Sequence, residues 1–389
     1  MPPGCPGALF GGPLINKKIK NMLVTNITYK RVFQLALTLL LAGCATDTEN
    51  RRSDTLAAVM PQNKVPSAPK PVVKAAVSLP PAQSFSQPVS VPAPAYSART
   101  LTGIYARSQP VHDFIRHMVQ KHGFSETYLN GLFSQATRLD SVIRLETAPR
   151  GHGPAKPGVW TRYRSKFLTD QHISHGVQFW IDNADIIQKA SATYGVDPEY
   201  IVAIIGVETY FGRNVGKTGT FNALATLAFD TPRRTRFFTS ELENFLLMTR
   251  EEGFDPLEPV GSWAGAMGLG QFMPSSFRSL AVDFDHDGVR DLWNQKDAIG
   301  SVANYFSHSG WQRSKPVARQ AKGGNAKSTI ALSTYQGNEH WQVYPNFKVI
   351  KRYNNSNNYA MAVHQLAQAI KQSYAAKQGP ALVMGQGGR

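Results

Sequence analysis

The sequence predicts a mainly α-helical protein of the α+β class, with a small antiparallel β insertion near its C-terminal end. Several spans between residues 100 and 373 have a helical pattern, whereas residues 328–349 are rich in residues that favour strands. The chain of 389 residues is 42% hydrophobic and 17% charged, which is typical of a soluble core with additional low-complexity sequence. The sequence contains no internal repeat.

The N-terminal segment has the features of an export signal. Two basic residues precede an apolar run at 32–41, which is about ten residues long and too short to span a bilayer comfortably. The run ends in Leu41-Ala42-Gly43-Cys44, which resembles the lipobox of bacterial lipoproteins. We therefore expect residues 1–43 to be removed as a signal peptide and Cys44 to carry a lipid. An ordinary signal peptide with an unrelated cysteine is the alternative.

The residues after Cys44 predict a tether. Ala45 stands where an aspartate would favour retention in the inner membrane, so the resemblance implies an outer-membrane lipoprotein that faces the periplasm of a Gram-negative bacterium. Residues 44–99 form a Pro/Ala-rich linker, because 61–98 contains nine prolines and no acid and cannot bury enough apolar surface to fold. The only other cysteine, Cys5, lies upstream, so the mature chain has no disulfide.

Residues 100–196 are expected to form an N-terminal α domain. Helices are predicted over 111–122, from 125 to 132 and over 160–194, with a Gly/Pro-rich break at 150–158. The core candidates in the last span are Phe167, Phe179, Trp180, Ile181, Ile186 and Ile187.

The next helix carries a carboxylate, Glu208, inside the apolar stretch IVAIIGVETYFGRNVG at 201–216. Asp197-Pro198-Glu199 provides a cap, a proline at the first helical position and an acid in the first turn, so the helix begins there. Glu208 shares a face with apolar residues spaced three and four apart, namely Ile201, Ile204, Ile205 and Phe211.

Burial would make the Glu208 carboxyl suitable for acid catalysis. An ionised carboxylate in a core costs several kcal/mol unless it is paired or protonated. Desolvation would raise the pKa of Glu208 and keep it protonated, ready to act as a general acid near neutral pH. The alternative is a core glutamate paired with Arg213 or Arg233.

Further helices are predicted over 240–251, 297–307 and 359–372, with a loop-rich stretch at 262–294. The antiparallel sheet is assigned to 328–349 on its β-forming residues Thr329, Ile330, Leu332, Trp341, Val343, Tyr344, Phe347 and Val349.

Residues 283–294 follow the twelve-residue calcium loop through its ninth position. The expected ligands are Asp283, Asp285, Asp287, the backbone carbonyl of Val289, and Asn294. Asn294 replaces the acid of the last position, which removes a charge and the bidentate contact, so we expect weak, structural binding of Ca²⁺. A polar Asp-Gly turn without an ion is the alternative.

Four motifs in order resemble the membrane-bound lytic murein transglycosylase B family. They are ETYFGR at 208–213, FDTPRR at 229–234, GAMGLGQFMPSS at 265–276 and RYN at 352–354. The resemblance extends from about residue 100 to the end of the last helix. It implies a lysozyme-like catalytic core at 197–311 and 347–373, a small β insertion at 312–346 and a flexible tail at 374–389.

The resemblance also implies a reaction. Family members cleave the β-1,4 bond between N-acetylmuramic acid and N-acetylglucosamine in peptidoglycan and leave a 1,6-anhydro ring. Glu208 would protonate the leaving oxygen and then accept the proton of the attacking C6 hydroxyl. Glycosidases that use water or a protein nucleophile need two carboxylates, whereas this intramolecular attack needs one. A hydrolytic muramidase and a non-catalytic peptidoglycan-binding lipoprotein are the competing interpretations.

The same resemblance assigns substrate-binding residues. Ser262, Gln271 and Asn354 would lie beside the muramyl sugar, and Tyr163, Tyr305, Tyr353 and Tyr359 would line the glycan groove. Hydrogen bonds within turns are the alternative for the first three, and core packing is the alternative for the tyrosines.

The net charge of +16 suits an anionic partner, which could be a cell-wall polymer, a membrane face or nucleic acid. The sequence has no phosphate loop or nucleic-acid motif. Its ten histidines show no zinc-binding spacing, and His172 and His175 are predicted to lie on the surface. We therefore expect a monomer that acts on peptidoglycan strands, attaches to the membrane by a lipid, needs no cofactor for chemistry, and can work with cell-wall synthesis proteins.

Overall fold

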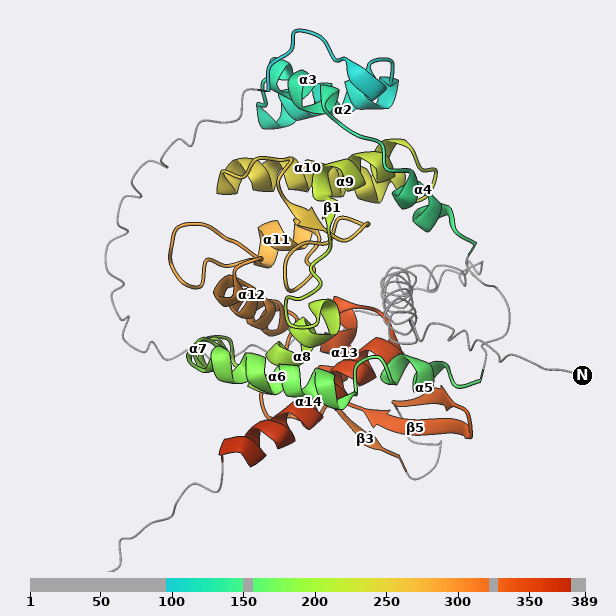
Figure 1. Ribbon diagram of the computed structural model, residues 1–389, viewed down its shortest axis with the longest axis vertical. Coiled ribbons are helices and arrows are strands. Elements are labelled where there is room, and N and C mark those ends of the chain that lie inside the picture. Colours follow the sequence, from blue (N-terminus) through green and yellow to red (C-terminus); the bar gives the residue numbers. More distant parts are fainter. Residues whose placement is uncertain (1–95, 150–156, 322–327, 379–389) are drawn as a thin grey trace, which may run out of the picture.

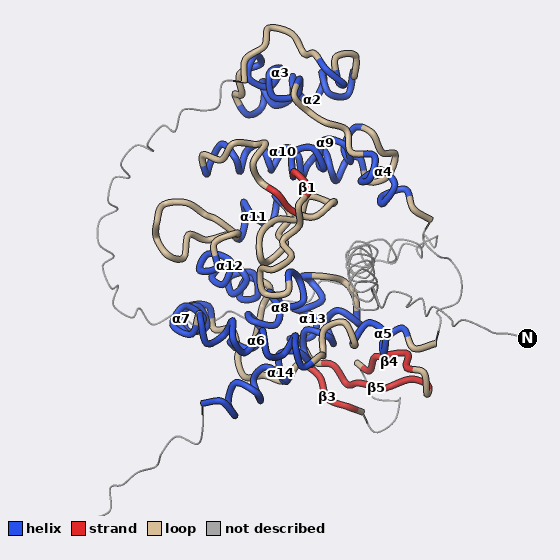
Figure 2. Tube along the Cα trace, in the orientation of Figure 1, coloured by secondary structure: helices blue, strands red, loops and turns tan. Residues whose placement is uncertain are grey.

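The computed structural model describes residues 96–149, 157–321 and 328–378. Helices dominate these ranges and two small antiparallel sheets accompany them, which confirms the predicted fold class (Figure 1 and Figure 2). Within these ranges, no helix combines the length and the apolar character needed to cross a membrane. The predicted lipid site, Cys44, lies outside the described residues.

Helices of the N-terminal segment and two later helices form one end of the molecule (Figure 1). They are the 3-10 helix η2 (Gly103–Tyr105), α2 (Gln109–His122), α3 (Glu126–Ser134), α4 (Asp140–Thr147), α9 (Thr220–Phe229) and α10 (Thr235–Glu252). Aromatic rings pack between the N-terminal helices and the two later ones: the ring centroids of Phe114 in α2 and Phe229 in α9 are 5.7 Å apart. The α3 helix begins as predicted, because the Ser125 side chain accepts a hydrogen bond from the backbone of Tyr128.

A second group of helices includes α8 (Pro198–Thr209), the helix that carries Glu208. The other members are α5 (Val159–Arg164), α6 (Asp170–Asp182), α7 (Ala184–Tyr194) and α14 (Asn357–Gln378). Residues 100–196, predicted as one α domain, are therefore divided between the two ends of the molecule. The reason is packing, since α6 and α7 lie against α8, α12 (Gln295–His308) and α14 rather than against α2–α4.

The span 160–194 forms three helices instead of one continuous stretch. Thr169 caps α6 by accepting a hydrogen bond from the backbone of His172, and Asn183 separates α6 from α7. The core prediction for Ile181 is wrong, because its side chain is 40% exposed. At the other end of this group, α14 continues to Gln378, so residues 374–378 of the predicted flexible tail are helical.

The α8 helix lies in the centre of this group and is buried on every face from Glu199 to Thr209. Asp197 precedes it as predicted, but its carboxylate accepts hydrogen bonds from Trp311 Nε1 and the Ser314 backbone rather than from α8. Phe211 lies beyond the helix, in a left-handed turn with φ 58°, and so does not extend the face of Glu208 as predicted. It is nevertheless buried.

The C-terminal part contributes a three-stranded sheet of order β3-β5-β4, formed by β3 (Ala318–Gln320), β4 (Thr329–Thr334) and β5 (Gly337–Val343). The strand assignment fails for Tyr344, which precedes α13 (Pro345–Tyr353) as its N-cap, and for Phe347 and Val349, which lie within α13. Pro345 at the start of α13 is compatible with a helix and not with a ladder hydrogen bond. The loop-rich stretch at 262–294 contains the short helix α11 (Pro274–Leu280). Strand β2 (Val260–Gly261) directly precedes this stretch and pairs with β1 (Thr218–Gly219).

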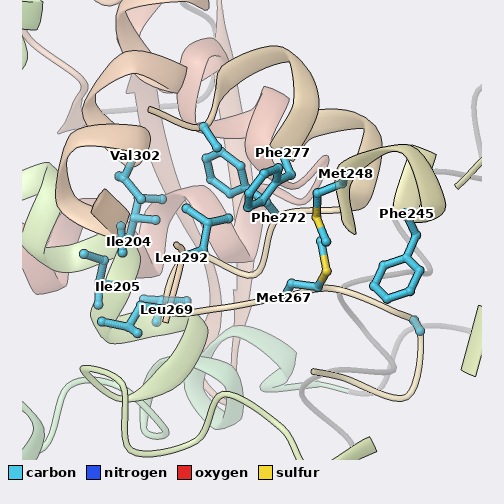
Figure 3. Packing of buried hydrophobic residues seen from close by; sticks show 14 of the residues in the cluster. Ile204, Ile205, Phe245, Met248, Met267, Leu269, Phe272, Phe277, Leu292 and Val302 are labelled. Carbon is cyan, nitrogen blue, oxygen red and sulfur yellow. The ribbon is translucent and has the colours of Figure 1, made fainter. Parts of the chain in front are cut away.

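A row of apolar side chains connects the two ends. Figure 3 shows Ile204 and Ile205 of α8 at one side of this row and Phe245 and Met248 of α10 at the other. Between them lie side chains from the connecting loops and from α11, namely Met267, Leu269, Phe272, Phe277 and Leu292, while Val302 of α12 lies beside Ile204. The glycine-rich loop at 265–272 is therefore part of the core and fixes the position of α8 relative to α10.

Candidate active site

Glu208 lies in the last turn of α8, and its side chain has one hydrogen-bond partner given by the structure. The residue is 4% exposed, and its Oε1 accepts a hydrogen bond of 2.6 Å from the hydroxyl of Tyr359 in α14. The arginines proposed as alternative partners are occupied elsewhere. Arg213 lies over the Tyr210 ring, and Arg233 donates to the backbone oxygen of Glu146. Glu208 is thus a buried acid without a cationic partner among the described residues.

This environment determines the protonation of Glu208. Burial raises its pKa from the ordinary 4.5 to about 7, while the hydrogen bond from Tyr359 lowers it. A carboxyl with such a pKa exists in both forms near neutral pH. It can therefore donate a proton and later take one back.

Three tyrosines from three helices approach Glu208. Burial, and then the charge of Glu208, raise the pKa of Tyr163 in α5, Tyr353 in α13 and Tyr359 in α14. Tyr359 is fully buried, whereas Tyr353 is partly exposed. The structure therefore brings all three predicted residues to the same carboxyl.

Tyr353 also belongs to an aromatic cluster with Tyr305 of α12. The centroids of the two rings are 4.6 Å apart, and the Phe272 ring contacts both. The Tyr353 hydroxyl donates to the Gly270 oxygen at 2.5 Å, and the Tyr305 hydroxyl donates to the Arg352 oxygen at 2.8 Å. These bonds hold two aromatic rings beside the glycine-rich loop.

The polar residues predicted in the loops make turn contacts. Ser262 Oγ accepts a hydrogen bond from the Ala266 backbone, and Gln271 Nε2 donates to the oxygens of Val215 and Gly268. Asn354 differs from both, because its Oδ1 is buried and makes no hydrogen bond within the described residues. An amide oxygen in this state can accept a hydrogen bond from a ligand.

Sequence reasoning missed Thr209, which connects α8 to the glycine-rich loop. Its buried hydroxyl donates to the Leu269 oxygen at 2.9 Å and accepts from the Gly212 backbone at 3.0 Å. Residues 210–212 all have positive φ, a conformation that is costly for Tyr210 and Phe211. The Thr209 bonds stabilise this turn directly after Glu208. A hydroxyl adjacent to Glu208 in an apolar helix is the signal that could have revealed it.

The predicted calcium loop brings three carboxylates together. Oxygens of Asp283, Asp285 and Asp287 lie within 4.8 Å of one another. Asp285 Oδ1 is buried and has no hydrogen-bond partner in the described part of the chain, which fits a metal ligand. Asn294 does not offer its oxygen freely, because its Oδ1 caps α12 by accepting from the Lys296 backbone and its Nδ2 donates to Asp285.

Asp297, three residues beyond Asn294, was not predicted to contribute to this loop. It is fully buried, and its carboxylate accepts hydrogen bonds from the backbones of Phe284, Asp285 and Asp291. The Leu292 oxygen accepts from the Leu269 backbone at 2.8 Å. The calcium loop is therefore bonded both to α12 and to the glycine-rich loop beside Glu208.

The family model for the transglycosylase SLT domain matches residues 106–328 and, in a second match, 319–368. The chain belongs to the transglycosylase SLT domain family. It is similar to membrane-bound lytic murein transglycosylase B of Escherichia coli (strain K12), with 44% identity over 313 residues that cover 71% of this chain and 87% of that relative.

Solved structures extend the SLT family likeness to the fold. The Escherichia coli lytic transglycosylase SLT35 in complex with calcium superposes with a TM-score of 0.67 at 45% identity, covering 71% of this chain and 97% of that one. SltB1 from Pseudomonas aeruginosa gives 0.63 at 42% identity, covering 68% and 99%. SltB3 from the same organism, in complex with NAG-anhNAM-pentapeptide, gives 0.59 at 28% identity, covering 67% and 78%. These neighbours confirm the lysozyme-like fold that the motifs imply.

His172 and His175 of this SLT protein were predicted to lie on the surface, and this prediction is wrong for His172. It is buried, and its Nε2 lies 3.0 Å from the Gly206 oxygen of α8. Burial lowers the pKa of His172 to about 4, so it is neutral at neutral pH. The α6 helix thus contacts α8 two residues before Glu208.

Proposed function

We propose that this SLT-family protein cleaves the β-1,4 bond between N-acetylmuramic acid and N-acetylglucosamine of peptidoglycan and leaves a 1,6-anhydro end. The observation that carries the proposal is the buried carboxyl of Glu208 with a pKa of about 7, hydrogen-bonded to Tyr359 and without a cationic partner among the described residues. The named activity of the Escherichia coli relative supports the substrate class.

One acid suffices for this reaction. Protonated Glu208 donates its proton to the glycosidic oxygen as the bond to the anomeric carbon breaks. The resulting carboxylate accepts the proton of the C6 hydroxyl, whose oxygen forms the new bond to that carbon. The Tyr359 hydroxyl stabilises the carboxylate stage by donating to Oε1. The anhydro sugar in the SltB3 complex supports the cyclised product over the hydrolysed one.

The remaining candidate residues would bind the glycan. Tyr305 and Tyr353 offer aromatic rings for stacking on sugars, and Asn354 Oδ1 can accept a hydrogen bond from an N-acetyl group. Ser262 and Gln271 shape the loop that faces the muramyl sugar. Tyr163 and Tyr359 are more deeply buried, so we assign them to the surroundings of the Glu208 carboxyl.

Product analysis tests the reaction against its two competitors. Purified sacculi are digested with the protein, and the released muropeptides are weighed by mass spectrometry. Anhydro-ended products support the proposal. Reducing ends one water heavier would identify a hydrolytic muramidase, and a lack of release with retained binding would identify a peptidoglycan-binding lipoprotein.

The Glu208→Gln variant tests the role of the carboxyl. Glutamine is nearly isosteric but cannot deliver the proton, so we expect the release of muropeptides to fall at least a thousandfold while sacculus binding persists. Glu241→Gln is a matched control, because Glu241 is also buried but bonds to Ser275 of α11. Turnover that survives in Glu208→Gln would remove this residue from the acid role.

The calcium loop would hold a structural Ca²⁺ through Asp283, Asp285, Asp287 and the backbone carbonyl of Val289. Asn294 would contribute little, because both of its polar atoms are engaged. The calcium complex of SLT35 supports this assignment. The ion would be structural, with no part in the proton transfers.

We also propose that the protein is an outer-membrane lipoprotein that is anchored through Cys44 and faces the periplasm. The name of the Escherichia coli relative, which includes the words membrane-bound, supports attachment to a membrane. Peptidoglycan strands are the main partner, cell-wall synthesis proteins are further partners, and the working form is a monomer without a cofactor for chemistry.

A further inference from the structure

A cluster of two histidines and one glutamate lies on α2 and α10, at the end of the molecule away from α8 and Glu208 (Figure 1). His117 and His122 belong to the last turns of α2, and Glu243 belongs to α10. His122 Nε2 lies 2.7 Å from Glu243 Oε1, and His117 Nε2 lies 3.2 Å from Glu243 Oε2. Ligand atoms of all three residues lie within 4.8 Å of one another.

We propose that His117, His122 and Glu243 form a binding site for a divalent transition-metal ion, with Zn²⁺ as the best fit. Two imidazoles and one carboxylate are a common zinc ligand set that leaves a fourth position open. Zinc bonds of about 2.0–2.2 Å in a tetrahedron place neighbouring ligand atoms roughly 3.3 Å apart. The nitrogen and oxygen atoms therefore need only small displacements to bind the ion.

The site is positioned by contacts outside the three ligands. Gly123, with φ 66°, ends α2 directly after His122. Arg250 of α10 donates to the His122 backbone oxygen at 2.7 Å and lies 4.1 Å from the centre of the Phe124 ring. These contacts hold the end of α2 against α10, so that His122 faces Glu243 before any ion binds.

The chemistry of the cluster separates this site from the calcium loop. Two of its three ligand atoms are imidazole nitrogens, which suit zinc, copper and nickel, whereas Ca²⁺ prefers oxygen. The side chains of His122 and Glu243 are 17% and 18% exposed, so both are largely shielded from solvent. An adjacent cavity of about 420 Å³, lined in part by His117, Glu243 and Phe114, leaves room for water at the open position.

The ammonium group of Lys121 competes with a metal ion for the Glu243 carboxylate. Lys121 Nζ forms an ion pair with Glu243 Oε1 at 2.9 Å, and the imidazole nitrogens of His117 and His122 lie within hydrogen-bond distance of the same carboxylate. The Lys121 side chain is 57% exposed and can turn to solvent when a cation takes its place. Metal binding would replace these contacts with coordination bonds that link α2 and α10 through the ion.

Calorimetric titration tests the proposal with the metal alone. The full chain is freed of metal with a chelator, dialysed, supplied with excess CaCl₂ to fill the calcium loop, and titrated with ZnCl₂. We expect one Zn²⁺ per chain, at least tenfold weaker binding in His117→Ala or His122→Ala, and loss of binding in the double variant. His308→Ala removes an exposed histidine elsewhere and should bind as the wild type does.

Thermal unfolding gives a second measurement. At a hundredfold excess over Kd, Zn²⁺ should raise the melting temperature of the wild type by roughly 5 °C and leave the double variant unchanged. Visible absorption bands of tetrahedral Co²⁺ should appear in the wild type and vanish in the double variant. No stoichiometric binding in the wild type, or equal binding in the double variant, would overturn the proposal.

Discussion

At the scale of single residues, burial and one hydrogen bond act in opposite directions on Glu208. Burial raises its pKa to about 7, and the Tyr359 hydroxyl lowers it. The unfolded chain ionises near 4.5, so the folded state loses stability as pH rises from 4.5 to 7, by about 3 kcal/mol in all. Burial of Glu208 thus lowers the stability of the folded state at neutral pH, and it keeps the carboxyl partly protonated there.

Tyr359→Phe isolates the hydrogen bond, because it removes only a hydroxyl. Without this donor the pKa of Glu208 should rise, so the fall of kcat/KM with increasing pH should move from about 7 to a higher pH. The carboxylate stage loses its stabilising contact, and we expect kcat to fall roughly tenfold. The measurement is a pH profile of muropeptide release.

Tyr374→Phe serves as the control for Tyr359→Phe. Tyr374 lies in the same helix, α14, but stacks on Trp180 at 4.4 Å and has no contact with Glu208. Its pH profile should match that of the wild type. An unshifted profile in Tyr359→Phe would show that the hydroxyl does not influence the proton on Glu208.

The burial of Glu208 could be predicted from the sequence, because a carboxylate in an apolar helix contradicts the local pattern. Its role as an acid stays a prediction. The partner tyrosines came from the family resemblance, since their spacing alone also fits a core. Thr209 was missed although it directly follows Glu208. The proposed zinc ligands His117 and His122 were missed because they gain their significance from Glu243, which lies more than a hundred positions away.

At the scale of elements, hydrogen bonds join the predicted calcium loop at 283–294 to the candidate active site. Asp297 bonds it to α12, and the Leu292 oxygen bonds it to Leu269 in the glycine-rich loop. Arg290 in the calcium loop also forms an ion pair with Glu252 of α10. A cation that orders this loop should therefore stabilise the residues near Glu208.

Removal of calcium tests this connection. Without the ion, Asp283, Asp285 and Asp287 repel one another, so EGTA should lower the melting temperature of the wild type by several degrees. Asp285→Asn removes one charge and should abolish most of this calcium-dependent shift, as followed by differential scanning calorimetry. Asp185→Asn, in α7, is the control and should retain the full shift. Equal responses in both variants would contradict the loop assignment.

At the scale of the whole molecule, helix positions could be predicted from local pattern but their grouping could not. The spans for α2, α3 and α12 were placed within two residues at each end, whereas α10 begins five residues earlier and α14 ends six residues later than predicted. The division of residues 100–196 between two ends depends on contacts with α9, α10, α8 and α14, which no local pattern encodes. Phe347 and Val349 were misplaced for a related reason, because β-forming residues also occupy the buried face of α13.

The glycine-rich loop connects the two ends, and Leu269→Ala tests its role. Leu269 is 4% exposed and packs in the row between α8 and α10, while its backbone oxygen accepts from Thr209 beside Glu208. A cavity at a buried leucine costs about 2–5 kcal/mol. We expect this loss of unfolding free energy together with at least a tenfold lower kcat per folded molecule, because the loop can no longer hold the turn after Glu208.

Leu129→Ala provides the matched comparison, since Leu129 in α3 is equally inaccessible and lies at the far end of the molecule. It should cost a similar free energy in urea denaturation but leave kcat unchanged at a temperature where both variants are folded. If both variants lost activity in proportion to stability, the loop would act only as core. If Leu269→Ala alone lost turnover, the apolar row would position the Glu208 carboxyl in addition to stabilising the fold.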